Sequence, residues 1–505
     1  MTKGIGNWLK KFSEFDPDKL ALVFKDKRFT YKEFNERVNQ LAHAFVSLGV
    51  RKGDRVDALL LNTNEALESM FACAKIGAIF VPINFRLSVD EVLYIVNDSG
   101  ANHFIYDERL RPVVDALRQK ESKLIDYIHV GRNPHEEDYE YEQLIEGSST
   151  EEPAYDISLD DIHLMMYTSG TTGRPKGAML SHGNTQWNAI NCINFMPTHS
   201  TDITLTVAPL FHIGGMSVFT TPLFYKGGTV ILDDNFDPKS VMQKIQEEKI
   251  TGLFFVPAMW QALTTVDNFD DYDISSLRFC VSGGAPCPIT IIEYFQARGI
   301  PFYEGFGLTE TAPFVSLLDA KNSIRKNGSV GKAPVHTDVR IVDPNDRDVP
   351  AGEVGELIVK GPNVMVGYWN KPEATKEAIK DGWFYTGDLA KFDAEGFIYI
   401  VDRKKDMIIT GGENVYPIEV EQVLYRHPNI REAAIIGYPD EKWGESIKAV
   451  ISLKDTSSPF TIEDIQQFLD GKIARYKVPK KIEVVDALPR NATGKILKTV
   501  LRKEA

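Results

Sequence analysis

The chain of 505 residues has little of what marks secreted, membrane or nucleic-acid-binding proteins. Its four cysteines form no Cys-x-x-Cys pair, which argues against a disulfide framework and a zinc ribbon. The longest apolar stretch, 70–85, is interrupted by Lys75 and Asn84 and is shorter than the roughly 20 residues of a membrane span. The first residues lack the apolar stretch of a signal peptide. We therefore expect a cytoplasmic protein, with membrane contact at most peripheral.

An excess of basic residues is also missing. The chain has 57 basic and 71 acidic residues, a net charge of −14, which argues against a nucleic-acid partner. The segment 471–505 differs, with ten basic and three acidic residues. This break predicts a separate small C-terminal domain with an anionic partner, although a solvated basic face would look the same. The 43% hydrophobic content suffices for a large core, and the length suggests two to four folding units.

Residues 1–150 alternate between helical and strand patterns. Thr30 is a candidate helix cap, because Glu33 follows three residues later and apolar residues then recur at the helical spacing. Apolar runs predict buried strands at 55–61 and 78–83. This alternation predicts an α/β fold with parallel sheets covered by helices. From 325 to 401, short β-rich runs between Gly and Asp turns predict an antiparallel sheet or small barrel.

The most specific local signal is Tyr167-Thr-Ser-Gly-Thr-Thr-Gly-Arg-Pro-Lys-Gly177, which follows an apolar strand candidate. Glycines let backbone N–H groups approach an anion, and hydroxyls and two cations add donors and charge, as a triphosphate requires. The segment is not a Walker A loop, because Pro175 stands where the second glycine belongs. Nor is 305–310 a dinucleotide fingerprint, because Glu310 replaces its third glycine. A glycine-rich surface turn is the plain alternative.

Thr168-Ser-Gly-Thr-Thr-Gly-x-Pro-Lys-Gly resembles the phosphate-loop signature of the adenylate-forming superfamily, and further motifs follow in that family's order along nearly the whole chain. The superfamily holds acyl-CoA synthetases, peptide-synthetase adenylation domains and beetle luciferases. The resemblance implies an α/β fold. A large N-terminal domain, 1–401, would consist of layered α/β subdomains and a small β-barrel-like subdomain. A smaller, mobile α+β domain, 402–505, would follow a hinge near Asp402.

The same resemblance implies a site for ATP and Mg²⁺. Thr168 and Glu310 would hold the metal, which suits their hard oxygen atoms. Phe306 replaces the family's usual tyrosine, so adenine stacking remains expected and any hydroxyl contact is lost. The Asp388 carboxylate would accept hydrogen bonds from the ribose hydroxyls. The ATP-binding residues implied in this way are Thr168, Ser169, Gly170, Thr171, Thr172, Gly173, Lys176, Gly283, Gly284, Ala285, Glu304, Gly305, Phe306, Gly307, Thr309, Asp388, Arg403 and Lys495.

Pro489-Arg-Asn-Ala-Thr-Gly-Lys495 resembles the family's C-terminal lysine motif. A lysine that bridges the acid's carboxylate and the α-phosphate can stabilise the transition state of adenylation. Thioester formation needs a thiol at the same carbonyl, so the small domain would have to move between the half-reactions. The CoA contacts that the resemblance implies are Gly411, Gly412, Trp443 and Arg475.

Pro209-Leu-Phe-His-Ile-Gly-Gly215 provides the clue to the substrate. Amino-acid-activating relatives usually carry an Asp near this point, and its absence favours an uncharged acyl group. His212 resembles the family's catalytic gate beside the carboxylate. The resemblance is greatest to bacterial fatty-acyl-CoA synthetases, so we expect a CoA ligase for a medium- or long-chain fatty acid. An aryl-CoA ligase and an adenylation enzyme that loads a carrier protein remain alternatives, and a homodimer remains open.

Overall fold

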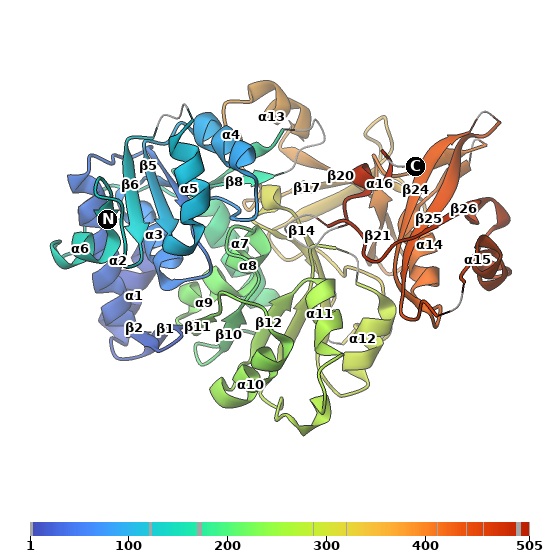
Figure 1. Cartoon of the computed structure of the whole chain (residues 1–505), viewed down its shortest axis with the longest axis horizontal. Coiled ribbons are helices and arrows are strands. Elements are labelled where there is room, and N and C mark those ends of the chain that lie inside the picture. Colours follow the sequence, from blue (N-terminus) through green and yellow to red (C-terminus); the bar gives the residue numbers. More distant parts are fainter. Residues whose placement is uncertain are drawn as a thin grey trace.

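A computed structural model describes residues 4–120, 124–168, 174–285, 287–319, 321–411, 413–440, 442–457, 459–490 and 496–503. Figure 1 shows a larger lobe built by the N-terminal and central elements and a smaller lobe that carries the C-terminal strands. Within the described ranges, no helix has the length and apolar character needed to span a membrane.

The first sheet has eight strands in the order β18-β9-β8-β4-β3-β5-β6-β7, with the neighbours from β8 to β7 parallel. The expected strands at 55–61 and 78–83 are confirmed as its members β3 and β4. Its strands are β3 (Arg55–Leu59), β4 (Ile79–Pro82), β5 (His103–Asp107), β6 (Asp126–Val130), β7 (Tyr139–Glu140), β8 (Ile162–Thr168), β9 (Lys176–Ser181) and β18 (Gly367–Tyr368).

The second sheet, also of eight strands, runs β15-β14-β13-β12-β10-β11-β1-β2 and is parallel from β14 to β1. Its short strands are mostly buried, as expected for a sheet with helices on both faces. They are β1 (Leu20–Phe24), β2 (Lys27–Thr30), β10 (Ile203–Thr206), β11 (Thr229–Leu232), β12 (Gly252–Phe255), β13 (Phe279–Ser282), β14 (Phe302–Gly307) and β15 (Phe314–Leu317).

Helices pack against the two sheets, and one of several hydrophobic core clusters contains residues of both sheets. Thr30 caps α2 (Tyr31–Ser47) and forms a capping box with Glu33, as the sequence predicts. Rings of Phe34, Phe71 and Phe224 meet at centroid distances of 5.3–6.1 Å. The other helices of the larger lobe are α1 (Gly6–Phe15), α3 (Asn64–Ile76), α4 (Val89–Ser99), α5 (Arg111–Arg118), α6 (Tyr141–Glu146), α7 (His182–Phe195), α8 (Ile213–Gly215), α9 (Thr221–Lys226), α10 (Pro238–Glu248), α11 (Pro257–Leu263), α12 (Ile289–Gln296) and α13 (Pro372–Ala378).

The β-rich segment after residue 325 forms an antiparallel sheet, as expected. It comprises β16 (Asp338–Val342), β17 (Gly355–Lys360), β19 (Ile379–Lys380), β20 (Trp383–Phe392) and β21 (Ile398–Arg403). Short 3₁₀ or π turns complete the chain: η1 (Glu108–Leu110), η2 (Met216–Thr220), η3 (Phe269–Asp271), η4 (Thr309–Thr311) and η5 (Arg475–Lys477).

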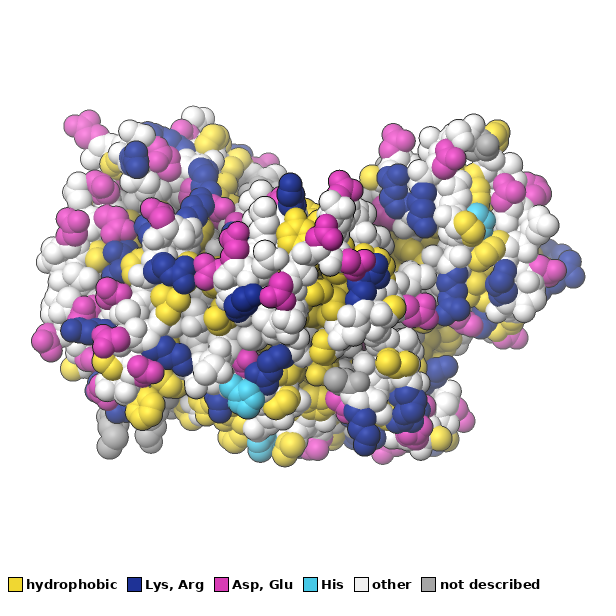
Figure 2. All heavy atoms as spheres, turned by 90° about the horizontal axis from the view of Figure 1, so that it is seen from below, with side chains coloured by type: hydrophobic (Ala, Val, Ile, Leu, Met, Phe, Trp, Pro, Cys, Tyr) yellow, Lys and Arg dark blue, Asp and Glu magenta, His cyan; other side chains and the backbone are white. Residues whose placement is uncertain are grey.

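The smaller lobe has its own sheet and its own core. The sheet follows the order β23-β22-β25-β24, with β26 beside β25. Figure 2 shows Lys and Arg side chains spread over this lobe and a hollow between it and the larger lobe. Its elements are β22 (Ile408–Thr410), β23 (Glu413–Val415), α14 (Pro417–Leu424), β24 (Ile430–Asp440), β25 (Gly444–Leu453), α15 (Ile462–Leu469), β26 (Lys481–Val484) and α16 (Lys498–Leu501).

Candidate active site

Thr168 and Glu310 come together although 142 positions separate them. Thr168 is the last residue of β8, and Glu310 lies in η4, directly after β14. Thr168 Oγ1 lies 3.4 Å from Glu310 Oε1. Adjacent ligands of an octahedral Mg²⁺ lie about 3 Å apart, so this pair of oxygen atoms fits the metal. Mg²⁺ usually takes only one or two protein ligands and completes its shell with phosphates and water.

The phosphate-loop residues Ser169, Gly170, Thr171, Thr172 and Gly173 lie outside the described residues, but α4 holds both flanks of their segment. On one side the Tyr167 hydroxyl donates to Asp98 Oδ2 at 2.9 Å. On the other, the Tyr94 hydroxyl donates to the Pro175 carbonyl at 3.1 Å. Lys176 is paired with Thr168 across β8 and β9. Lys176 and the candidate metal ligand Thr168 therefore lie opposite one another on neighbouring strands.

A tyrosine that the sequence reasoning missed completes this corner. The Tyr368 hydroxyl donates to Glu310 Oε1 at 2.9 Å, and Lys176 Nζ lies 5.0 Å from the centre of the Tyr368 ring. Burial, together with the nearby Glu310 carboxylate, raises the pKa of Tyr368, so its hydroxyl keeps its proton. No sequence motif predicts this contact, because it is the pairing of β18 with β9 that brings Tyr368 to the site.

The candidate adenine pocket lies at the carboxyl ends of β13 and β14, where ligands bind in open α/β sheets. Ser282 and Glu304 are register partners there. Glu304 is buried, its Oε2 has no partner among the described residues, and burial raises its pKa to about 8. A buried unpaired carboxyl oxygen is costly, which fits an acceptor that waits for a ligand donor. The expected pocket residues Gly283, Gly284, Ala285, Gly305, Phe306, Gly307 and Thr309 follow these two positions.

At two of these positions a side chain would clash with neighbouring atoms, which explains why they are glycines. A Cβ atom on Gly283 would lie 3.0 Å from Phe254 Cε2 and 3.3 Å from the Gly305 carbonyl oxygen. A Cβ atom on Gly307 would lie 2.1 Å from the Pro313 carbonyl oxygen, which is closer than any real contact. The backbone is therefore packed too closely here for side chains.

Asp388, the expected ribose contact, forms an ion pair with Arg403, which is expected to contact either the ribose or a phosphate. They lie opposite one another on β20 and β21, with Arg403 Nε 2.5 Å from Asp388 Oδ1. Asp388 is only 2% exposed, and its backbone N–H donates to Thr386 Oγ1 at 3.1 Å. The arginine fixes the acid in one orientation before any sugar arrives.

The candidate hinge residue Asp402 lies next to Arg403 on β21, in the same pair of antiparallel strands. Its carboxylate accepts hydrogen bonds from the backbone N–H groups of Arg403 at 2.7 Å and Ile418 at 3.1 Å. Burial raises its pKa to about 6, and the positive charge of Lys498 opposes that rise. Lys498 Nζ itself lies 2.8 Å from Glu421 Oε1 on α14. The sequence reasoning missed this lysine, although it stands only three positions after Lys495.

Lys495 and Gly412 lie outside the described residues. The two flanks of the lysine motif meet, because Arg490 and Ile496 form a β-bridge and the Leu497 N–H donates to the Pro489 carbonyl at 2.8 Å.

On the acyl side, His212 directly precedes α8 among aromatic rings. Its ring centre lies 4.4 Å from that of Phe211, which in turn lies 5.1 Å from Phe85. His212 Nε2 is buried with no partner among the described residues. Burial, with a smaller contribution from Arg86, lowers the pKa of His212 to about 3. The imidazole is therefore neutral at physiological pH.

The expected CoA contacts lie on the smaller lobe. Trp443 is 42% exposed and covers Gly411, whose Cβ, if present, would lie 2.8 Å from the indole Cε3 atom. Lys442 Nζ and Lys480 Nζ lie 4.8 and 5.2 Å from the Trp443 ring. Arg475 begins η5 and is exposed. An exposed aromatic ring with cations beside it suits an anionic ligand that also carries a flat base.

Comparison with known proteins identifies the family of the chain. The AMP-binding enzyme family matches residues 9–369, and the AMP-binding enzyme C-terminal domain matches 419–495. A feruloyl-CoA synthase of Amycolatopsis sp is 42% identical over 501 residues, covering 99% of each chain. A long-chain-fatty-acid–CoA ligase of Mycobacterium tuberculosis is 38% identical over 509 residues, covering 99% of this chain and 98% of the relative.

The crystal structure of an anthranilate CoA ligase in complex with anthranoyl-AMP superposes with a TM-score of 0.93 at 30% identity, covering 100% of this chain and 97% of that one. The chain therefore belongs to the AMP-binding enzyme family, within the adenylate-forming superfamily. It is an ATP-dependent, AMP-forming acid–CoA ligase, which uses ATP with Mg²⁺ and takes CoA as a substrate.

Proposed function

We propose that this enzyme joins an aromatic carboxylic acid to CoA. The observation that carries the proposal is the position of Phe254 between the acyl and nucleotide motifs. Its ring lies where the side chains of Gly214 and Gly283 would otherwise be, 2.7 and 3.0 Å from their hypothetical Cβ atoms. Gly214 is two residues after His212, and Gly283 follows β13.

We infer that Phe254 shortens the acyl pocket and gives it an aromatic wall. Its ring packs onto a cluster that includes Phe219, Phe279 and Phe314. In that position it would block a long alkyl chain that extended past Gly214. Phenyl faces and edges instead favour a second aromatic ring, with centroid distances of about 4.5 to 7 Å. The similarity to a feruloyl-CoA synthase supports the aromatic acid, and the similarity to a long-chain-fatty-acid–CoA ligase makes a straight-chain acid the competing substrate.

We assign the first half-reaction to the larger lobe and to Lys495. A carboxylate oxygen of the acid attacks the α-phosphorus of ATP, and pyrophosphate leaves. The phosphate loop 169–173 and Lys176 would bind the phosphates, Glu304 the adenine, and Asp388 with Arg403 the ribose. Mg²⁺, held by Thr168 and Glu310, would neutralise charge on the phosphates. Lys495 would stabilise the developing negative charge.

The second half-reaction would use the other residues of the smaller lobe. The CoA thiol attacks the acyl carbonyl carbon of the acyl-adenylate, and AMP leaves with the electron pair of the broken acyl–phosphate bond. Gly411 and Gly412 would leave room for the pantetheine arm, and Trp443 and Arg475 would contact CoA. Rotation at Asp402 would move domain 402–505 against domain 1–401 between the two steps.

The experiment is CoA-dependent AMP formation across acetate, octanoate, palmitate, benzoate, ferulate and succinylbenzoate. We expect the highest kcat/KM on an aromatic acid. Phe254→Ala should raise the ratio of octanoate to ferulate activity, because it removes the ring that we expect to limit the length of the acyl chain. Phe255→Leu is the matched control: its ring faces the opposite core, beside Phe236 and Trp260, so the ratio should not change.

Two results would contradict the proposal. A wild-type optimum on octanoate or palmitate would establish the straight-chain substrate instead. Acid-dependent pyrophosphate release without CoA turnover would indicate a carrier-protein partner.

A further inference from the structure

We propose that Tyr368 is a positioning residue that fixes the Glu310 carboxylate for metal binding. The inference rests on the proposed role of Glu310 as a metal ligand. The Tyr368 hydroxyl donates to Glu310 Oε1 at 2.9 Å. Tyr368 is itself fixed, because it pairs with Ala178 across β18 and β9 and its backbone N–H donates to Thr375 Oγ1 at 2.9 Å.

Glu310 needs such support because of where it lies. It belongs to the three-residue 3₁₀ turn η4, and such turns are short and have poorer hydrogen-bond geometry than α-helices. The segment that contains Tyr368 holds Glu310 twice: the Met365 N–H donates to the Glu310 carbonyl at 2.8 Å, and Tyr368 holds the carboxylate. In the described part of the chain, both side-chain hydrogen bonds to Glu310, from Thr168 and Tyr368, reach the same oxygen, Oε1.

The arrangement lowers the cost of binding a cation. A glutamate already held in one rotamer loses less conformational freedom when the metal arrives. Hydrogen bonds to ligating carboxylates tune metal affinity, and their removal typically costs about 10- to 100-fold. Tyr368 also contacts the phosphate side of the site, because Lys176 Nζ lies 5.0 Å from its ring centre. One side chain thereby contacts both the anionic metal ligand and the cation expected to bind phosphate.

The test measures ATP binding rather than turnover. The affinity of wild-type and Tyr368→Phe enzyme for α,β-methylene-ATP is measured by calorimetry without acid or CoA, with and without Mg²⁺. The phenylalanine keeps the ring under Lys176 and removes only the hydroxyl. We expect the gain in affinity that Mg²⁺ produces to decrease about 10-fold or more, while the affinity without Mg²⁺ stays the same. A purely structural role would weaken both affinities equally, and that result would overturn the proposal.

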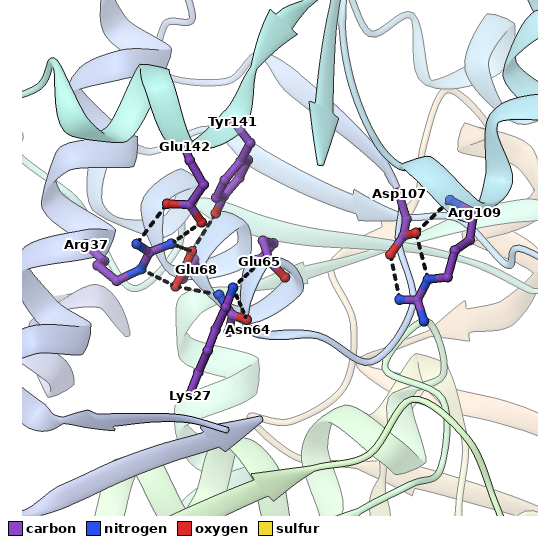
Figure 3. A network of polar contacts seen from close by, with 9 residues as sticks. All are labelled: Lys27, Arg37, Asn64, Glu65, Glu68, Asp107, Arg109, Tyr141 and Glu142. Carbon is purple, nitrogen blue, oxygen red and sulfur yellow. Dashed lines mark hydrogen bonds and ion pairs between the residues drawn. The ribbon is translucent and has the colours of Figure 1, made fainter. Parts of the chain in front are cut away.

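Tyr141→Phe is the matched control (Figure 3). It removes the same kind of bond, from the Tyr141 hydroxyl to Glu68 Oε2 at 2.8 Å, and Glu68 keeps its partners Arg37 and Asn64. The Mg²⁺-dependent gain should be unchanged in this variant.

Glu310→Gln distinguishes the proposed metal role of Glu310 from the positioning role of Tyr368. If it abolishes the gain while Tyr368→Phe leaves the gain intact, the metal role of Glu310 stands and the inference about Tyr368 is wrong. If neither variant alters the gain, both the metal role and the inference are wrong.

Discussion

Replacing Lys498 by methionine tests the buried charge cluster at the candidate hinge. The side chains of Lys498 and Glu421 are only 14% and 13% exposed, and their charged atoms lie 2.8 Å apart. Lys498 is also the positive charge that opposes the rise in the pKa of Asp402. The substitution therefore leaves two buried acids without their cation.

The expected cost is large. Breaking a buried ion pair by removing one partner costs about 3 to 5 kcal/mol, because the remaining charge stays buried without compensation. Lys477→Met offers the contrast. Lys477, 16% exposed, pairs at 2.7 Å with Glu419, which lies on the same helix α14 as Glu421 but is 43% exposed. Such an accessible pair contributes about 1 kcal/mol or less.

Hydrogen exchange of the amides in α14 and β24 measures the free energy of opening of the smaller lobe. We expect Lys498→Met to lower it by about 3 kcal/mol or more and Lys477→Met by about 1 kcal/mol or less. Adding Glu421→Gln to Lys498→Met should recover part of the loss. Glutamine removes the unpaired charge and can still accept the Ile435 N–H, which now donates to Glu421 at 2.7 Å.

The pH dependence provides a second criterion. The pKa of Asp402 is raised to about 6, so its contribution to stability is complete below pH 4 and is lost as the pH rises through 6. Without Lys498 this pKa rises further, so the difference between variant and wild type should be smaller at pH 5 than at pH 7.5. Equal costs for Lys498→Met and Lys477→Met, or a cost independent of pH, would refute the reasoning.

Three further predictions concern the nucleotide and acyl sites. Glu304 has a pKa raised to about 8, so its contribution to stability is lost as the pH rises through 8. Between pH 6 and 9 the wild type should lose about 3 kcal/mol through this group, and thermal unfolding of Glu304→Gln should lack that loss. His212, with its pKa lowered to about 3, should titrate outside the range pH 5.5–8, so His212→Asn should slow adenylation without altering the shape of its pH–rate profile. A vanished inflection would contradict this. Asp388→Asn should weaken ATP binding about 10-fold by calorimetry, because the acceptor loses its charge; unchanged affinity would argue against a ribose contact.

Features that depend on neighbouring residues could be predicted from the sequence. Thr30 and Glu33 cap a helix through hydrogen bonds within one turn. The apolar runs that predict β3 and β4 each lie within a single short segment of the sequence. The phosphate-loop motif and the order of the later motifs identified the family in the same way. The division at 401/402 and the roles of the individual site residues stay predictions.

Features that depend on long-range packing could not be predicted. Tyr368 reaches Glu310 from 58 positions away, and Lys498 reaches Glu421 from 77 positions away. No local pattern distinguishes this tyrosine or this lysine from the many exposed ones. The proposed substrate class belongs to the same group, because it rests on the position of the Phe254 ring beside Gly214 and Gly283.

The sequence by itself determined the family, the chemistry and the residue types that chemistry requires, because hydroxyls, glycines, carboxylates and lysines carry their functional groups wherever they stand. Only the tertiary structure decided their ionisation and their partners. Burial makes His212 neutral and raises the pKa of Glu304, and pairing holds Asp388 and Glu310 in place. The physical reason is that desolvation and hydrogen bonding depend on what surrounds a group in space, and that surrounding is assembled from distant parts of the chain.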